Sequence, residues 1–256
     1  MCYLMSLYSS ALRFYERALE IREEQLGSDH PDTAIILNNI GNVCHDTGKY
    51  DDALKMHKRA LSIREEKLGR DNKYTSGSYN NIGITYTSQK DYESALKYYH
   101  KAMDIKEKLY GTEHPETAMV YNNIGYVYRM QNDYDTAMDY YNKALAAYNK
   151  KSDEDNQFSI VLNINRADIY RLQGCNVKAL DSYSSILKKQ LNTAGECHVQ
   201  TAVIYAGIAE TYLNLKKYDK AKEFFSLALD IYTKLPGTTH EAESIHSRIC
   251  GIKRYF

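Results

Sequence analysis

The chain has 256 residues, carries 33 basic and 33 acidic side chains, and is 43% hydrophobic. This apolar content is enough for a folded core, which excludes a disordered chain, and the balanced charge gives no general attraction to nucleic acid or to anionic lipid. No stretch approaches the ~20 consecutive apolar residues that span a bilayer, and the N-terminal sequence lacks the features of a signal peptide. We therefore expect a cytoplasmic protein that binds no nucleic acid and inserts into no membrane.

Small residues recur along the chain at an interval of 42 residues. The first series is glycine or alanine: Gly41, Gly83, Gly125, Ala167, Ala209 and Gly251. The second series is alanine throughout: Ala11, Ala53, Ala95, Ala137, Ala179 and Ala221. A ring follows each of these alanines four positions later, at Tyr15, His57, Tyr99, Tyr141, Tyr183 and Phe225. Such copies in phase indicate a repeat array in which each copy is one structural unit.

Each repeat predicts two helices, which we call helix A and helix B. Residues 117–130 put apolar or small side chains at the i, i+3, i+4 and i+7 positions of one face, which predicts helix A, and residues 134–148 predict helix B. Pro31 and Pro115 suit the first turn of a helix, where a missing N–H loses no partner. The turn between the helices often falls on residues that tolerate left-handed backbone: Gly48, Lys90, Asn132, Gly174 and Lys216.

This helix–turn–helix pattern resembles the tetratricopeptide repeat. In the repeat at 111–152, the residues that match the family pattern are Tyr121, Ile124, Gly125, Tyr128, Ala137, Tyr141 and Ala144. The 42-residue period and the connector YGTEHPETA, followed by NNIG, look like the kinesin light chain-like subtype. The resemblance implies an all-α fold, a right-handed superhelix (α-solenoid) of about 12 antiparallel-paired helices with a concave inner groove. Ala167 and Ala209 depart from the pattern, as does the segment SDEDNQFSI in place of the connector.

The period also predicts how the chain is divided. We expect a partial repeat at 1–26, repeats at 27–68, 69–110 and 111–152, a divergent repeat at 153–194, a repeat at 195–236, and a terminal helix, cap or truncated repeat at 237–256. The sequence starts within one helix A and stops within another, whereas repeat arrays generally end in capping elements. We therefore expect that it is part of a longer polypeptide.

Pairs of asparagines recur in helix A. With the repeated small residue numbered position 8, position 6 is Asn39, Asn81, Asn123 and Asn165, and position 5 is Asn38, Asn80 and Asn122. At ~100° per residue, both positions point away from the core, towards the inner surface of a tetratricopeptide superhelix. Asparagine disfavours helix, so a compensating role is expected. We predict that these amides bind the backbone of an extended peptide, a role that the resemblance to kinesin light chain-like repeats also implies.

Other inward positions are expected to select the peptide sequence. The predicted specificity residues are Asn42, Ile84, Met119, Tyr126, Arg129 and Arg171. They favour a protein or peptide partner that mixes apolar and acidic side chains, with the arginines pairing carboxylates. Two alternatives stay open. In the first, the amides bond to each other or to neighbouring helices and stiffen the array without a ligand. In the second, Asp168 and Glu210 neutralise arginines on a solvated face.

No pattern in the sequence predicts an enzyme, a metal site or a cofactor, because zinc-protease, P-loop and nucleophile-elbow motifs are all missing. Histidines recur in the connector, at His30, His114, His198 and His240, with Asn72 and Asn156 in the intervening copies. Stacking keeps the connectors apart, so we expect turn or capping roles rather than metal binding. Three functions are left: a peptide-binding adaptor or scaffold module, a sensor or regulatory module of a larger enzyme or receptor, and an oligomerisation scaffold.

Overall fold

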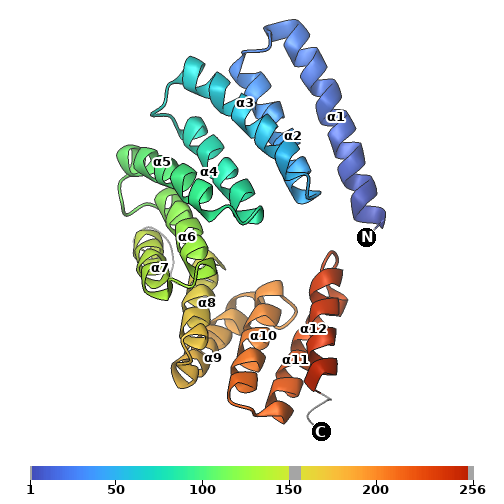
Figure 1. Ribbon diagram of the computed structural model, residues 1–256. Helices are drawn as coiled ribbons and strands as arrows, with labels where there is room; N and C mark the ends of the chain where they lie inside the picture. Colours follow the sequence, from blue (N-terminus) through green and yellow to red (C-terminus); the bar gives the residue numbers. More distant parts are fainter. Residues whose placement is uncertain (1, 150–156, 253–256) are drawn as a thin grey trace. The chain divides into compact units, whose positions relative to one another are not determined.

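The structure, a computed structural model, describes residues 2–149 and 157–252, and this part of the chain forms twelve α-helices and no strands (Figure 1). The helices are α1 (Cys2–Leu26), α2 (Pro31–Asp46), α3 (Tyr50–Leu68), α4 (Lys73–Ser88), α5 (Tyr92–Tyr110), α6 (Pro115–Met130), α7 (Tyr134–Asn149), α8 (Gln157–Leu172), α9 (Asn176–Ala194), α10 (Val199–Asn214), α11 (Tyr218–Lys234) and α12 (Thr239–Ile252). The all-α prediction is confirmed. Among the described helices, none is long and apolar enough to cross a membrane.

The helices fall into two compact units, Met1–Asn132 with α1 to α6 and Asp133–Phe256 with α7 to α12. Within each unit, every helix packs against the next one in the chain. The A helices of successive repeats also touch, since α4 contacts α2 and α6 in the first unit and α8 contacts α10 in the second. This is the stacking of helix pairs that the 42-residue period predicts.

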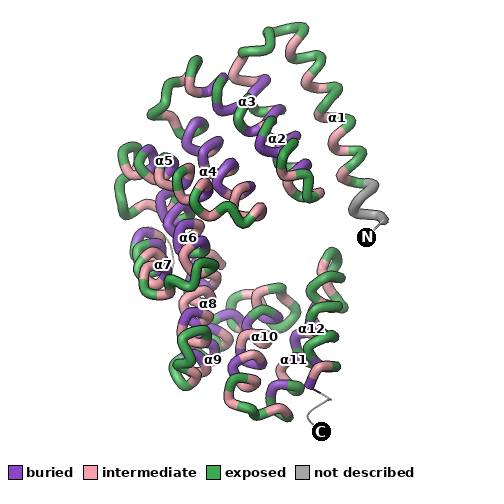
Figure 2. Tube along the Cα trace, in the orientation of Figure 1, coloured by how far each residue is buried: buried purple, intermediate pink, exposed green. Residues whose placement is uncertain are grey.

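A buried ring recurs four positions after the repeated alanine of helix B, and in the helix pairs α2–α3 and α4–α5 it is seated on a glycine. The rings in this position are almost fully buried: His57, Tyr99, Tyr141, Tyr183 and Phe225. A Cβ added at Gly83 in α4 would lie 2.6 Å from the ring of Tyr99, and one at Gly41 in α2 would lie 2.6 Å from His57. Only glycine lets a ring approach the helix backbone this closely. The recurring glycine therefore marks the seat of the ring, and Figure 2 shows buried stretches along the helices of each unit.

One recurring set of contacts holds the connectors between repeats. Gly111 follows α5 with φ of 85°, and the hydroxyl of Thr117 donates to its carbonyl oxygen at 2.8 Å. The Nδ1 of His114 accepts a hydrogen bond from the backbone N–H of Glu116 at 3.1 Å and so caps α6. The equivalent threonine bonds are made by Thr33, Thr75 and Thr201. The connector motif thus encodes a left-handed helix end, a helix cap and a tie between them.

The capping prediction is confirmed for most of the connector residues. The residues that accept a backbone hydrogen bond at a helix N-terminus are His30, Asn72, His114 and His198. The prediction is wrong for His240, which lies inside α12, because this helix begins one residue earlier, at Thr239. Asn156 is outside the described residues. Helices α2 and α6 begin at Pro31 and Pro115, as expected.

The turn inside each helix pair has the left-handed backbone that the sequence predicts. The φ angle is 77° at Gly48, 62° at Lys90, 62° at Asn132, 76° at Gly174 and 58° at Lys216. A non-glycine residue pays roughly 1–2 kcal/mol for this conformation. The packing of the two helices on either side holds the lysines in it.

Candidate functional site

Asparagines at positions 5 and 6 of helix A bond to one another between layers of the first unit. The Nδ2 of Asn81 in α4 donates to the Oδ1 of Asn38 in α2 at 2.9 Å. One repeat later, the Nδ2 of Asn123 in α6 donates to the Oδ1 of Asn80 in α4, also at 2.9 Å. All four side chains are partly buried. Amide-to-amide bonding, one of the alternatives left open by the sequence, is therefore observed for these two pairs, and it fixes the orientation of the position-6 amide.

These bonds do not use all the hydrogen-bonding groups of each position-6 amide, because a primary amide carries two donors and a carbonyl acceptor. The Nδ2 of Asn81 also approaches the Oδ1 of Asn42, at the longer distance of 3.5 Å. The Oδ1 atoms of Asn81 and Asn123 accept no hydrogen bond from the described residues, and the side chain of Asn39 makes none with them. The corresponding residues Asn122 in α6 and Asn165 in α8 are partly buried.

A cavity of about 310 Å³ lies beside Asn81, between α2 and α4. Its lining residues are Asn42, His45, Asp46, His57, Asn81, Ile84 and Thr85. Three of the predicted site residues, Asn42, Asn81 and Ile84, therefore meet at one hollow. His45 links the same two helices, because its Nε2 lies 2.9 Å from the hydroxyl of Ser88.

His57 in α3 supplies the buried ring at this cavity. Its Nδ1 lies 3.2 Å from the Oδ1 of Asn38. Burial, with smaller contributions from the nearby His45 and Arg64, lowers the pKa of His57 from 6.5 to about 4. The ring is neutral near pH 7, and its Nδ1–H donates to the same oxygen that holds Asn81. Sequence reasoning missed His57 as a site residue. A signal was present, since His57 is the one ring position in the series that is neither tyrosine nor phenylalanine.

Apolar side chains stand exposed on helices α2 and α6 of the first unit. Met119 is 53% exposed, Ile35 is 46% exposed and Tyr126 is 37% exposed. The guanidinium carbon of Arg129 lies 4.9 Å from the centre of the Tyr126 ring, a cation–π distance. Three predicted specificity residues, Met119, Tyr126 and Arg129, thus lie in one helix, α6.

Charged residues on helices A of the second unit pair with one another. The Nη2 of Arg171 lies 3.3 Å from the Oδ1 of Asp168, and the hydroxyl of Tyr183 donates to that same oxygen at 2.6 Å. Glu210 pairs with Arg248 of α12 at 3.3 Å. The alternative in which Asp168 and Glu210 neutralise arginines is therefore observed, and Arg171 already has a carboxylate partner.

The position-6 asparagines stop at α10 for a steric reason. Position 8 of α8 is Ala167 rather than glycine. The ring of Tyr183 lies against the next helix A, where a Cβ added at Gly207 would be 2.6 Å from it. Gly207 is position 6 of α10, so an asparagine there would collide with the ring. The sequence shows two separate replacements, and the structure shows that they belong to one rearrangement.

Comparisons with known proteins agree with this architecture. A family model described as tetratricopeptide repeat matches residues 1–66, 74–150 and 158–234, which make up most of the chain. Among solved structures, BtubC (BKLC) from P. vanneervenii is 17% identical, with 91% of this chain and 92% of that chain covered and a TM-score of 0.72. A Podosopora anserina protein described as a kinesin light chain with nearly identical TPR-like repeats is 15% identical, with 81% and 99% covered and a TM-score of 0.66.

Yeast Tom70 is a further structural match, at 17% identity and a TM-score of 0.61, with 95% of this chain and 43% of that chain covered. At these identities the likeness shows the fold. No curated protein sequence matches the chain.

Proposed function

Because the chain belongs to the tetratricopeptide repeat family, whose repeats are generally protein–protein interaction scaffolds, we propose that it binds an extended peptide segment of a partner protein. The observation that carries this proposal is the pair of oriented amides at Asn81 and Asn123, one of which lines the cavity between α2 and α4. Each amide is held by the layer before it and still has an acceptor oxygen to offer. A peptide unit needs both a donor and an acceptor of this kind.

The spacing of the layers fits a peptide backbone. Neighbouring packed helices lie ~10 Å apart, and an extended chain advances ~3.3 Å per residue, so one asparagine meets roughly every third peptide unit. In this proposal Asn39, Asn81 and Asn123 contact the ligand, and Asn165 is the equivalent residue of the second unit. Asn38 and Asn80 act through the orientation of the position-6 amides, and Asn122 holds the same position in α6.

Selectivity for the ligand's side chains comes from the exposed residues beside the amides. Ile35, Met119 and Tyr126 offer apolar contacts, and Asn42 and Ile84 line the cavity. Arg129, which stacks on Tyr126, and Arg171, which pairs with Asp168, are the basic residues among the predicted specificity residues. The proposed ligand is therefore a segment that is mainly apolar with acidic residues among the apolar ones.

A library of decapeptides built from leucine, methionine, tyrosine, aspartate, glutamate and glycine tests the proposal. The tightest peptide is selected with the wild-type chain, and its affinity is then measured by fluorescence anisotropy. Asn81→Ala and Asn123→Ala should each weaken binding about fivefold to tenfold, because a net hydrogen bond contributes about 1–1.5 kcal/mol. Unchanged affinity in both variants, with thermal unfolding like that of the wild type, would reject peptide capture by the ladder.

Asn38→Ala is the matched control for this experiment. It removes the oxygen that holds Asn81 but keeps the Asn81 amide. We expect a loss of affinity smaller than that of Asn81→Ala, since the amide is still present but less well oriented. A larger loss in Asn38→Ala would instead make the position-5 asparagine the contact residue.

Two other functions differ from peptide capture in what they require. An oligomerisation scaffold predicts self-association, so light scattering that shows a stable dimer, unaffected by Asn81→Ala, favours that function. A regulatory module predicts that peptide binding changes the activity of an attached domain. A non-enzymatic role and a cytoplasmic location are part of the proposal, and imaging of the tagged protein tests the location.

A further inference from the structure

The helix pair α8–α9 carries polar side chains at four positions that are apolar in the other full helix pairs. Asn163 takes the place of Leu37, Tyr79, Tyr121 and Tyr205, and Arg166 takes the place of Ile40, Ile82, Ile124 and Ile208. Ser182 takes the place of Met56, Tyr98, Tyr140 and Phe224, and Lys189 takes the place of Ile63, Ile105, Ala147 and Ile231. The isoleucines that correspond to Arg166 are all buried core residues. Exchanging apolar for polar groups at core positions costs stability, so the fold alone does not account for this layer.

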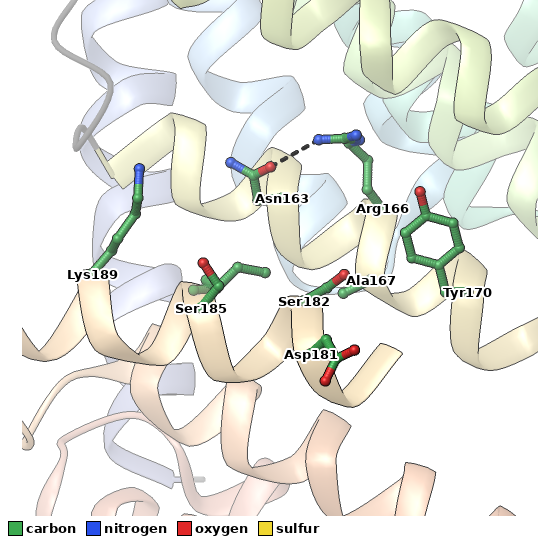
Figure 3. Close-up of a pocket in the computed structure, with 9 residues that line it drawn as sticks. Asn163, Arg166, Ala167, Tyr170, Asp181, Ser182, Ser185 and Lys189 are labelled. Atoms are coloured by element: carbon green, nitrogen blue, oxygen red, sulfur yellow. Dashed lines mark hydrogen bonds between the residues drawn. The ribbon is translucent and has the colours of Figure 1, made fainter. Parts of the chain in front are cut away.

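All four side chains line one cavity of about 430 Å³ between α8 and α9, together with Tyr170 and Ser185 (Figure 3). In Figure 3 the charged ends of Lys189 and Arg166 lie on either side of Asn163. Asp181 also belongs to the lining, but its exposed side chain lies at the opposite end of α9 from Lys189 in this view. The lining thus has two cationic groups, several hydroxyl groups and one carboxylate.

The Arg166 side chain is held in place by a neutral partner, and its charge is not paired with a carboxylate of the described residues. Its Nη1 donates to the Oδ1 of Asn163 at 3.0 Å, and the Nδ2 of Asn163 is fixed by a 2.9 Å bond to the carbonyl oxygen of Ser159. The Nε of Arg166 is buried without a hydrogen-bond partner among the described residues, and no carboxylate in that part of the chain pairs with the guanidinium. A half-buried guanidinium whose N–H groups are not all hydrogen-bonded favours an anionic ligand.

This cavity is separate from the candidate peptide surface. Asn163, Arg166 and Tyr170 follow the i, i+3, i+7 spacing of one face of α8. Asn165 and Asp168 lie on the opposite face, because each residue advances by ~100° around the helix. A ligand in the cavity therefore does not depend on the peptide proposal.

We propose that the cavity binds the phosphate group of a small phosphorylated molecule. Arg166 donates its free N–H groups, Lys189 adds positive charge, and the hydroxyls of Ser182 and Ser185 donate to the remaining oxygens. A phosphate monoester has three terminal oxygens and a charge of about −2, which uses these donors more fully than the two oxygens of a carboxylate. The volume of about 430 Å³ exceeds that of a phosphate group and lies within the range of roughly 300–1,000 Å³ typical of small-molecule pockets. An organic part about the size of a sugar therefore fits as well.

Isothermal titration calorimetry with inorganic phosphate and with glucose 6-phosphate tests this site, at an ionic strength held constant with sodium chloride. Wild-type chain should bind glucose 6-phosphate saturably. Arg166→Gln should weaken binding about tenfold or more, because it removes a charged hydrogen bond. Lys189→Gln should also weaken binding, because it removes a positive charge from the cavity lining. Lys188→Gln is the matched control, since Lys188 is the exposed neighbour that does not line the cavity, and its affinity should equal that of the wild type.

A second variant covers the case in which single substitutions disturb the fold. Arg166→Ile with Lys189→Ile restores the residues of the regular layers, so it should unfold at a higher temperature than the wild type while losing phosphate binding. Equal affinity in Arg166→Gln and Lys188→Gln, or no saturable binding of either small phosphate, would overturn the proposal. Tighter binding of a phosphoserine peptide than of glucose 6-phosphate would also overturn it, because the ligand would then be a protein.

Discussion

In the helix pair α4–α5 the ring of Tyr99 rests on Gly83 of its own repeat, whereas in α8–α9 the ring of Tyr183 rests against Gly207 of the next repeat. The first arrangement leaves position 6 of the following helix A free, and Asn123 occupies it. In the second arrangement the ring of Tyr183 fills the space beside position 6 of the following helix A, which is Gly207, and the asparagine series ends. The seat of a buried ring therefore decides whether the next layer can carry a residue of the candidate peptide surface.

The same two helix pairs also differ in their core positions. Tyr79, Ile82 and Ile105 are buried in the first pair, and Asn163, Arg166 and Lys189 take their places in the second. A repeat array tolerates this exchange because each layer is supported by its neighbours. Residues that depart from the repeat pattern are therefore candidate binding residues, even though they lower the stability of the fold.

The largest effect concerns the ring position in α3, where His57 replaces the tyrosine of α5. The pKa of His57 is lowered to about 4 in the folded chain, against 6.5 for the ordinary group. As the pH falls, the unfolded chain therefore binds a proton at His57 before the folded chain does. The contribution of the neutral His57 to the free energy of unfolding is complete above pH 6.5 and is lost as the pH falls towards 4. A shift of this size corresponds to about 3 kcal/mol.

Urea unfolding of the wild type and of His57→Tyr, measured across this pH range, checks the effect. His57→Tyr restores the ring of the other layers and should remove this part of the pH dependence. Equal losses of stability in the two proteins over the range would show that His57 is not held neutral in the folded state.

Gly207→Asn places the position-6 asparagine in the α10 layer. The added Cβ lies 2.6 Å from the ring of Tyr183, whose hydroxyl is bonded to Asp168. We expect a destabilisation of about 2–3 kcal/mol, as for overpacking of a core. In a Tyr183→Ala background the same substitution should cost at least 1 kcal/mol less, as a double-mutant cycle by chemical denaturation will show. Additive effects would mean that the ring does not exclude the asparagine.

Gly83→Ala and Gly77→Ala form a matched pair within α4. At Gly83 the new Cβ meets the ring of Tyr99, while at Gly77 no atom lies within 4 Å. Gly83→Ala should lower the free energy of unfolding by about 1–2 kcal/mol, and Gly77→Ala should raise it by about 0.5–1 kcal/mol through helix propensity. Thermal denaturation of both variants decides the matter, and a change of the same sign in both would remove the ring-seat explanation.

The smallest effect concerns the turns. Lys90 has a φ of 62° between α4 and α5, where Gly174 has 76° between α8 and α9. Lys90→Gly should stabilise the chain by about 0.5–1 kcal/mol, because it removes left-handed strain at some cost in chain entropy. Gly174→Lys should destabilise it by a similar amount. Shifts in urea midpoint that do not have opposite signs would contradict the account of the turns.

Much of the fold is readable from the sequence because it depends on local rules that repeat. The glycine and alanine series, Pro31 and Pro115, and the turn at Lys90 each predict backbone features that the structure has. The site was less predictable because an amide at Asn81 can satisfy either a neighbouring layer or a ligand, and sequence alone does not decide between them. Ala167 and Gly207 lie in two different helices, and their connection through the ring of Tyr183 is visible only in the three-dimensional structure.

The amide resonances of asparagine side chains give the most direct test of the proposed peptide surface. The chain is labelled with ¹⁵N at asparagine only, and the selected decapeptide is titrated in. The account predicts that the Nδ2 signals of Asn81 and Asn123 shift saturably with the affinity measured by anisotropy, and that the signal of the connector cap Asn72 does not. Saturable peptide binding with the Asn81 and Asn123 signals unmoved would contradict the account.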